Sequence, residues 1–349
     1  MNLFNSRTYV EDLSIALSHS IGIEQLGNKR VLITGATGTI GSFIADMLVL
    51  YNKNANANIR IYVVGRNIER LKERYSSFDV QPVITLEYDV NSPIQFDVPV
   101  DFVIHAAGNA HPAAFNSDPV GTIMGNIIGT YNLLEYMQNH AGKRLLYVSS
   151  GEVYGQGNLK LDEFQENYAG YLDISSPRSC YPSSKRVTEN LCASYSKQYG
   201  LETVVVRPCH TYGPVITSTD NRANAQFIRN ALNGENIIMK SAGSQIRSYN
   251  YIADCASAIL TVLVYGTSGE AYNIANPNVK ISIADLAKII AKTAGKQVLF
   301  VDPNAVDLAN RSPITKQVLN CKKIEALGWT SAYTVEKGIT NTIRILQGK

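Results

Sequence analysis

Two residues four positions apart in the segment YPSSK offer acid–base chemistry. Tyr181 and Lys185 would project from the same face of a helix, because residues i and i+4 are neighbours there. A free tyrosine, with a pKa near ~10, is a poor base at neutral pH, and a neighbouring ammonium group favours its phenolate form. The pair therefore predicts a general base that takes a proton from a hydroxyl group, although the same spacing alone also fits a solvated helix face.

Two further polar residues lie upstream of that helix, after the apolar run RLLYV. Ser150 ends this run, and Glu152 follows two positions later. Ser150 is placed to hydrogen-bond the same hydroxyl group as Tyr181, and a carboxylate at 152 can move a second proton. The catalytic residues predicted from the sequence are Ser150, Glu152, Tyr181 and Lys185.

A glycine-rich segment, GATGTIG, directly follows the apolar run RVLIT and opens a helical pattern. Glycines allow a tight turn that brings backbone N–H groups against a pyrophosphate, and the helix N-terminus offers partial positive charge to the anion. We therefore expect a nicotinamide dinucleotide here. The contacts predicted within this segment are Gly35, Thr37, Gly38, Thr39, Ile40 and Gly41.

The second predicted strand ends in Gly65 and Arg66, where NAD-binding proteins normally carry an acid that holds the ribose hydroxyls. An arginine suits the 2′-phosphate of NADP, and an arginine that stacks on adenine fits the sequence as well. The choice between NAD and NADP stays open at this point. The other cofactor contacts that we predict are Arg66, Asp89, Val90, Ala106, Ala107, Gly108, Tyr181, Lys185 and Pro208.

Six short runs rich in β-branched residues must position these groups: RVLITG, IRIYVVG, VITLEYDV, DFVIHAAG, RLLYVSS and ETVVVRP. They alternate with helical patterns, which predicts βαβ crossovers and an α/β fold with a doubly wound, parallel Rossmann sheet. We expect an N-terminal helical extension formed by a single amphipathic helix (1–28), a dinucleotide-binding Rossmann domain (29–208) and a smaller C-terminal substrate lobe (209–349). Within that lobe we expect helices over 223–233, 252–265, 282–292 and 335–347 and short strands over 237–240 and 271–274, with some segments returning to the Rossmann domain.

The composition excludes several classes of protein. Of 349 residues, 45% are hydrophobic and 17% charged, which is typical of a globular chain and not of a disordered one. A net charge of +3 argues against nucleic acid as a partner. No run reaches the ~18 apolar residues of a membrane span, and the polar N-terminus is unlike a signal peptide. We expect a cytoplasmic protein with no membrane partner, whose five scattered cysteines are reduced packing residues and bind no metal.

These motifs together resemble the extended short-chain dehydrogenase/reductase family, also called the NAD-dependent epimerase/dehydratase family. The resemblance covers residues 29–349 and rests on GATGTIG, HAAG, VSSGEVYG, YPSSK, RPCHTYGP and RSYNYIAD. Within the family, the stretch PRSCYPSSKRVTE is most similar to the Pro-Arg-x-Cys-Tyr-x-x-x-Lys-Arg-Val-x-Glu pattern of the UDP-glucuronate decarboxylases, or UDP-xylose synthases.

The resemblance implies bound NAD, a nucleotide-sugar substrate with UDP favoured, and a homodimer through a four-helix interface. Arg247 and Arg311 match arginines of the nucleotide side, with Arg247 on the diphosphate, and Asp254 matches an acid that we take as structural. The substrate contacts expected on this basis are Asn109, Arg178, His210, Arg247 and Arg311. Three departures from the family pattern are Gly65-Arg66 for Asp-Asn, His210 for Asn, and Gly151 for Ser.

The expected reaction begins with oxidation at C4 of the sugar, with Tyr181 as the base and nicotinamide as the hydride acceptor. A carboxylate at C5 then leaves as CO₂, and hydride returns. A 4,6-dehydratase is the second hypothesis, although Gly151 lacks the acidic side chain that dTDP-glucose dehydratases use there. A 4-epimerase is the third hypothesis. Its reaction needs only the tyrosine, the lysine and the serine, so Glu152 would have no catalytic role. A non-enzymatic dinucleotide-binding regulator would have little reason to keep all four catalytic residues.

Overall fold

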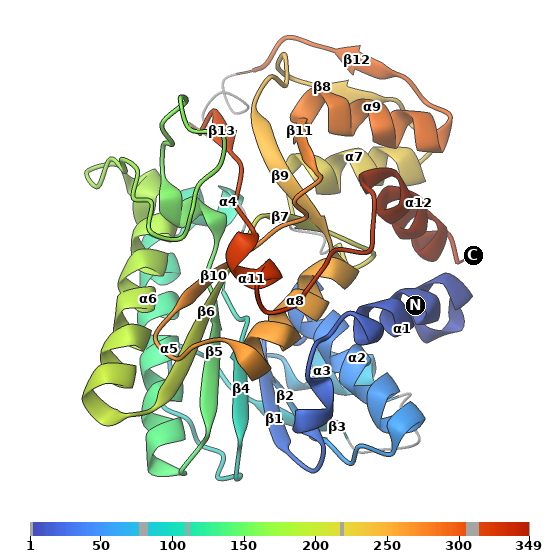
Figure 1. The fold of residues 1–349 in the computed structure, drawn as a ribbon. Coiled ribbons are helices and arrows are strands. Elements are labelled where there is room, and N and C mark those ends of the chain that lie inside the picture. Colours follow the sequence, from blue (N-terminus) through green and yellow to red (C-terminus); the bar gives the residue numbers. More distant parts are fainter. Residues whose placement is uncertain are drawn as a thin grey trace.

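A seven-stranded parallel sheet forms the centre of the molecule, in the strand order β10-β6-β5-β4-β1-β2-β3 (Figure 1). The computed structural model describes residues 3–76, 83–108, 110, 112–216, 220–304 and 314–348. The strands are β1 Arg30–Thr34, β2 Arg60–Gly65, β3 Val83–Glu87, β4 Phe102–His105, β5 Arg144–Val148, β6 Glu202–Pro208 and β10 Ala271–Ile274. The order reverses between β1 and β4, and a ligand is expected at such a switch point, beyond the carboxyl ends of the strands. The predicted doubly wound α/β fold is confirmed.

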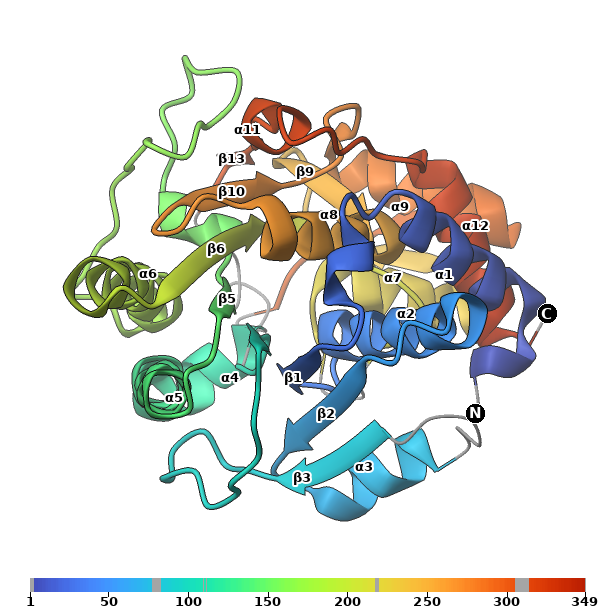
Figure 2. The same cartoon turned by 60° about the horizontal axis from the view of Figure 1, so that its bottom comes forward.

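Both faces of the sheet are buried because successive apolar residues of each strand point to opposite sides. Val31 and Ile33 pack in one hydrophobic cluster, whereas Leu32 belongs to the other. Helices cover the two faces, with α2 and α8 on one side and α5 and α6 on the other (Figure 2). The helices of this part are α2 Thr39–Ala55, α3 Ile68–Tyr75, α4 Pro112–Ser117, α5 Pro119–Asn139, α6 Cys180–Tyr199 and α8 Ile252–Tyr265.

The seventh strand comes from a part of the chain that the sequence pattern assigned to the smaller lobe. β10 pairs in parallel with β6, so that Ala271 lies opposite Val205. The helix before it, α8, packs against α2 and β6 and is buried along most of its length. A strand of four residues is too short for its hydrophobic pattern to indicate which strand it pairs with. Parallel strands also pair across long stretches of sequence, so the position of β10 could not be predicted. Residues 252–274 thus return to the central sheet, as expected for some segments of the lobe.

The remaining C-terminal chain forms two small sheets with helices packed against them, at the upper right of Figure 1. β9 is central to the larger one and pairs with β7, β11 and β13, while β8 pairs with β12. The strands are β7 His210–Tyr212, β8 Ile237–Met239, β9 Ile246–Tyr251, β11 Lys280–Ser282, β12 Val298–Phe300 and β13 Lys316–Gln317. The helices are α7 Ala223–Leu232, α9 Ile283–Ala294, α11 Lys322–Glu325 and α12 Val335–Leu346.

The N-terminal extension packs into the core through one amphipathic α-helix, which a short 3-10 turn flanks on each side. It consists of η1 (Leu3–Asn5), α1 (Arg7–Ser18) and η2 (Ile23–Leu26), and Gly22 with φ +80° separates the last two. Because this φ suits glycine and disfavours other residues, the chain turns here. The buried carboxylate of Asp12 on α1 accepts hydrogen bonds from the hydroxyls of Tyr251 at 2.5 Å and Tyr333 at 2.7 Å.

Two global properties follow from the described residues. None of the helices among them combines the length and apolar character that crossing a bilayer requires. All five cysteines lie in the described part of the chain, where each is buried and none forms a disulfide.

Candidate active site

The glycine-rich loop between β1 and α2 forms a cradle that only glycine permits. Gly35 has φ +67°, and a Cβ atom there would lie 2.6 Å from the carbonyl oxygen of Ala106. A Cβ atom on Gly41 would lie 2.5 Å from the carbonyl oxygen of Gly35. The loop and the N-terminus of α2 border a cavity of about 310 Å³. Free backbone N–H groups and the partial positive charge at a helix N-terminus fit a pyrophosphate, so the cradle suits a dinucleotide.

Most of the predicted cofactor residues line this cavity or the one beside it. The first is lined by Gly35, Thr37, Gly38, Arg66, Val90, Ala106, Ala107 and Gly108, among others. Ile40, Tyr181, Lys185 and Pro208 line the second. Three of the predicted cofactor residues line neither cavity. The Thr39 hydroxyl donates a hydrogen bond to the carbonyl of Val215 at 2.7 Å, and Gly41 packs against Gly35. The Asp89 carboxylate accepts a hydrogen bond from the backbone N–H of Asn91 at 2.9 Å.

The second cavity, of about 140 Å³, brings the four predicted catalytic residues together. Ser150 and Glu152 reach it from the end of β5 and from η3 (Gly151–Tyr154), and Tyr181 and Lys185 reach it from α6. Its wall shares Ala106, Ala107 and Gly108 with the first cavity. A dinucleotide in the cradle would therefore extend towards the catalytic residues.

Short contacts hold Ser150 and Glu152 at the mouth of this cavity. The Ser150 hydroxyl accepts a hydrogen bond from the backbone N–H of Glu152 at 3.1 Å and caps η3. The carboxylate of Glu152 faces the guanidinium of Arg178 at 3.4 Å, and Arg178 lies over the ring of Phe115 at 4.8 Å. The Phe115 ring also stacks on Tyr181 at 4.5 Å, so one aromatic ring orients both the base and the arginine.

Tyr181 is almost fully buried, and burial together with the charge of Glu152 raises its pKa to about 12. A hydrogen bond with Ser150 and the charges of Arg222 and Arg178 lower this pKa but do not outweigh the burial. Desolvation disfavours a phenolate unless a cation is close. In this structure, Tyr181 therefore needs a further positive charge beside it before it acts as a base near neutral pH.

Lys185 lies one helical turn from Tyr181, as predicted from the spacing. Its ammonium group donates a hydrogen bond to the carbonyl of Val148 at 2.8 Å and lies 5.7 Å from the centre of the Tyr181 ring. Burial lowers the pKa of Lys185 to about 7, while the charge of Glu189 raises it. Burial thus makes the ammonium form of Lys185 easier to deprotonate than that of a free lysine.

The predicted substrate residues have different surroundings. His210, on β7, lines the catalytic cavity, and burial next to Arg247 and Arg222 lowers its pKa to about 3, so it is neutral. Arg247 is 2% exposed and its guanidinium donates to the carbonyls of Ile246, at 3.0 Å, and Ile314. Within the described part of the chain Arg247 lines neither of these two cavities, and its role in binding stays a prediction. Asn109 and Arg311 lie outside the described residues.

Two residues that sequence reasoning missed also line the catalytic cavity, Arg222 and Gln317. The Arg222 guanidinium pairs with Asp220 at 2.6 Å, and its charge lowers the pKa of Tyr181. Gln317 ends the short strand β13. Neither residue belongs to a periodic pattern, since one follows a polar loop and the other lies in a two-residue strand. Only the fold brings them to the site.

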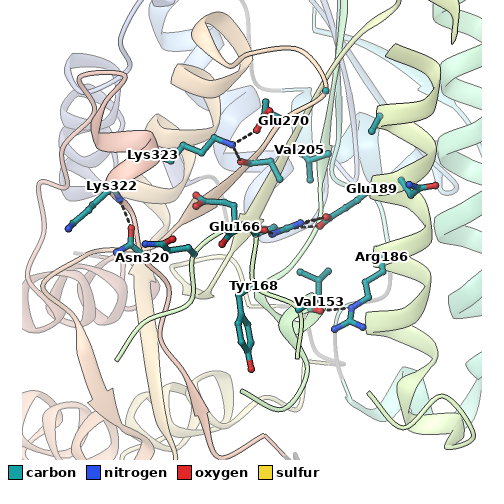
Figure 3. A pocket seen from close by; sticks show the side chains of 18 residues that line it. Val153, Glu166, Tyr168, Arg186, Glu189, Val205, Glu270, Asn320, Lys322 and Lys323 are labelled. Carbon is teal, nitrogen blue, oxygen red and sulfur yellow. Dashed lines mark hydrogen bonds and ion pairs between the residues drawn. The ribbon is translucent and has the colours of Figure 1, made fainter. Parts of the chain in front are cut away.

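A larger cavity, of about 790 Å³, lies between α6, the β6–β10 edge of the sheet and residues 165–169 (Figure 3). Three of its basic side chains already have partners within the wall. Arg207 pairs with Glu189 at 2.6 Å, Lys323 pairs with Glu270 at 2.6 Å, and Arg186 donates to the carbonyl of Val153 at 2.6 Å. The acid among them that bears on catalysis is Glu189, which raises the pKa of Lys185 and accepts a hydrogen bond from Ser149 at 2.5 Å. Glu189 therefore links the wall of this cavity to the catalytic cavity.

Known proteins resemble the chain over almost all of its length. UDP-glucuronic acid decarboxylase 1 of Xenopus tropicalis is 30% identical over 325 residues, which cover 92% of this chain and 73% of that protein. UDP-glucuronic acid decarboxylase 3 of Arabidopsis thaliana is 31% identical over 315 residues, covering 89% and 87%.

Solved structures with the same fold are less similar in sequence. A dTDP-glucose 4,6-dehydratase of Streptomyces venezuelae with bound NAD has a TM-score of 0.76 at 23% identity, covering 91% of this chain and 97% of that one. A UDP-glucose 4-epimerase of Thermotoga maritima with UDP-glucose has a TM-score of 0.74 at 23% identity, covering 91% and 98%. The model of a protein family, the NAD dependent epimerase/dehydratase family, matches residues 31–275, which extend from β1 to the end of β10. The chain therefore belongs to the NAD dependent epimerase/dehydratase family.

Proposed function

We propose that this protein oxidises C4 of a UDP-hexuronate, releases CO₂ from C5 and reduces the ketone again, which converts UDP-glucuronate to a UDP-pentose. One observation carries the proposal: Ser150, Glu152, Tyr181 and Lys185 line one cavity, and its wall continues into the glycine cradle. The relatives named UDP-glucuronic acid decarboxylase support the choice of substrate.

In the first step, the Tyr181 phenolate takes the proton of the C4 hydroxyl while Ser150 donates a hydrogen bond to the oxygen that becomes the ketone. When bound, oxidised nicotinamide accepts the hydride and brings a positive charge that favours the phenolate beside it. The buried amine of Lys185, which is also placed towards the dinucleotide, adds a second positive charge whenever it is protonated.

The second step uses the neighbourhood of Glu152. A ketone at C4 makes the C5 carboxylate that of a β-keto acid, so the C5–carboxylate bond breaks, CO₂ leaves, and the electron pair remains as an enolate at the C4 oxygen. Ser150 and Tyr181 stabilise that oxygen by hydrogen bonding. The Glu152 carboxylate orients a water molecule and passes a proton from it to C5, and Arg178 at 3.4 Å holds this carboxylate in place. Return of the hydride to C4 completes the pentose.

We propose that the chain accepts NADP as well as NAD. No acid follows β2, and the exposed Arg66 lines the cavity beside Gly65. A guanidinium binds a phosphate with two hydrogen bonds. Replacing Arg66 by alanine should weaken NADP binding about tenfold or more and leave NAD binding nearly unchanged, which titration of the protein with each dinucleotide measures. Equal losses for both dinucleotides would contradict this assignment.

We also propose a homodimer through α5 and α6. Large apolar side chains are exposed along these neighbouring helices, among them Val120, Met124, Tyr131, Val187 and Tyr199. Two such helices from each of two chains would form a four-helix interface that removes this apolar surface from water.

The experiment is incubation of the protein with UDP-glucuronate and NAD, followed by NMR spectroscopy of the sugar and measurement of CO₂. The expected products are CO₂ and a UDP-pentose in equal amounts. Unchanged UDP-glucuronate, with neither product, would refute the proposal. A panel of UDP-, dTDP-, GDP- and CDP-hexoses tests the dehydratase alternative, because a 4-keto-6-deoxy sugar from any of them would assign Glu152 to removal of the C5 proton instead.

A further inference from the structure

Gln317 is a buried polar residue whose amide nitrogen has no hydrogen-bond partner within the described part of the protein. The side chain is 2% exposed, and its Nε2 atom forms no hydrogen bond there. A buried N–H group without an acceptor is costly, and native proteins leave few of them. Gln317 lines the catalytic cavity together with Ser150, Glu152 and Tyr181, so an acceptor that enters this cavity would satisfy the amide.

The backbone fixes the place of this amide. β13 pairs in parallel with β9, and Gln317 lies opposite Arg247. On its other side the amide approaches Gly151, where a Cβ atom, if the residue had one, would lie 3.4 Å from Cδ and 3.5 Å from Nε2 of Gln317. A longer side chain at 151 would occupy the space of the amide. Glycine at this position therefore leaves Gln317 open to the cavity.

In the amino-acid sequence, Gly151 lies between two of the proposed catalytic residues, Ser150 and Glu152. Ser150 and Tyr181 mark the carbon that is oxidised, and Glu152 serves the next carbon. The Gln317 amide packs against Gly151 and lines the same cavity as Ser150 and Glu152, so it can meet a substituent of the bound sugar there. Its N–H group is a donor, and a carboxylate is the strongest acceptor that a sugar offers there.

We infer that Gln317 is a specificity-determining residue whose Nε2 donates a hydrogen bond to the sugar carboxylate carried by the carbon beside the oxidised one. The inference rests on the proposed function for the identity of this acceptor. Gln317 takes no part in proton or hydride transfer. It aligns the bond to the carboxylate that breaks when CO₂ leaves.

The experiment compares binding of UDP, UDP-xylose and UDP-glucuronate to the wild-type protein and to Gln317→Leu and Gln317→Glu by calorimetry, with thermal unfolding of each protein. Leucine removes the donor at similar volume, and glutamate replaces it by an anion. Both variants should bind UDP and UDP-xylose as the wild type does. Gln317→Leu should lose about tenfold or more in affinity for UDP-glucuronate, and Gln317→Glu should lose more, because two carboxylates repel each other.

Gln156→Leu is the matched control. The Gln156 amide donates to the Thr315 hydroxyl at 3.0 Å, so it contacts the segment next to Gln317 but lines neither the cradle nor the catalytic cavity. This variant should bind all three ligands normally. A purely structural Gln317 would instead lower the melting temperature of Gln317→Leu and weaken the three ligands equally.

The outcomes separate this inference from the proposed function. Unchanged affinity for UDP-glucuronate in both Gln317 variants overturns the inference, and so does an equal loss for UDP-xylose and UDP-glucuronate. If the wild type binds UDP-glucuronate without releasing CO₂, and Gln317→Leu still loses affinity for it selectively, the proposed function fails while the inference stands. A wild type that releases no CO₂ from UDP-glucuronate, with no effect of either substitution on its affinity for that ligand, overturns both.

Discussion

Among the single residues of the site, Tyr181 is the one whose pKa would depend most on the charge of a bound cofactor. Burial and Glu152 raise the pKa of Tyr181 to about 12, and burial lowers that of Lys185 to about 7. Tyr181 is therefore not set to act as a base near neutral pH by its protein surroundings alone. The positive charge of oxidised nicotinamide, when bound beside it, would favour the phenolate and would couple the base to the presence of the oxidant.

Replacing Tyr181 by phenylalanine should abolish turnover of UDP-glucuronate and preserve the fold. The ring keeps its stack on Phe115 at 4.5 Å, and only the hydroxyl group is lost. General base catalysis contributes about 10²–10⁴-fold, and a loss of that size in product formation, measured by NMR spectroscopy, is expected. Dinucleotide binding should persist within about threefold. Normal turnover by this variant would exclude Tyr181 as the base.

Replacing Glu152 by glutamine should separate oxidation from the later proton transfer. Tyr181 and Ser150 remain, so the sugar is still oxidised at C4 and loses CO₂, but return of a proton to C5 slows by about 10²-fold or more. The enolate that leaves the site before the hydride returns takes a proton from water, so a 4-keto pentose should be found by NMR spectroscopy in place of the final pentose. Arg178→Lys serves as a control, since it retains a cation next to Glu152 and should keep the normal product. If the glutamine variant forms the pentose at the wild-type rate, Glu152 is not the proton donor.

At the scale of elements, the loop between β1 and α2 should tolerate no side chain at its first glycine. Gly35→Ala combines φ +67° with a Cβ atom 2.6 Å from a backbone oxygen. Gly200 at the end of α6 is the matched control, because it has φ +72° and nothing within 4 Å of its Cβ position. The left-handed conformation alone costs about 1–2 kcal/mol, which both variants should show as a loss of unfolding free energy in urea. Gly35→Ala should lose more, and it alone should lose dinucleotide binding.

Asp254 at the start of α8 should make stability depend on pH. Its carboxylate accepts hydrogen bonds from the backbone N–H groups of Ala332 at 2.7 Å and Tyr333 at 3.3 Å, and burial raises its pKa from 3.8 to about 6. The folded state therefore holds a proton that the unfolded state releases above about pH 4. This contribution to stability is complete below that pH and disappears as the pH rises through about 6.

The wild type should accordingly lose about 1–2 kcal/mol relative to Asp254→Asn as the pH rises from about 5 to about 8. Urea unfolding of the two proteins at several pH values measures this difference. Asp285→Asn is the control, because the pKa of the exposed Asp285 is lowered by Ser282 and Lys288, so this group does not titrate in that range. A difference between wild type and Asp254→Asn that is independent of pH would contradict the assignment.

At the scale of the whole molecule, a charge on the apolar surface of α5 and α6 should prevent the proposed dimer. Val187 is 52% exposed on α6, and glutamate there would place a carboxylate in the interface without a partner. Sedimentation should give the mass of one chain for Val187→Glu and of two for the wild type. Leu299→Glu on β12, where the leucine is 41% exposed, should stay dimeric. A wild type that sediments as one chain would refute the dimer.

Features that depend on local patterns can be predicted from the amino-acid sequence. The glycine spacing after a strand, the four-residue spacing of Tyr181 and Lys185, and the alternation of strands with helices are all local. They were sufficient for the doubly wound sheet, and they named four residues that the structure brings to one cavity. Chain stiffness and steric limits act within a few residues, which is why such patterns can be read without a fold.

Features that depend on contacts between distant segments became visible in the folded protein. The tertiary structure placed β10 in the central sheet, Asp12 beside Tyr251 and Tyr333, and Gln317 against Gly151. It also showed that burial dominates the pKa values of Tyr181 and Lys185, which their spacing could not reveal. Desolvation and cross-chain pairing arise from the packing of residues far apart in the chain, so no window of sequence contains them.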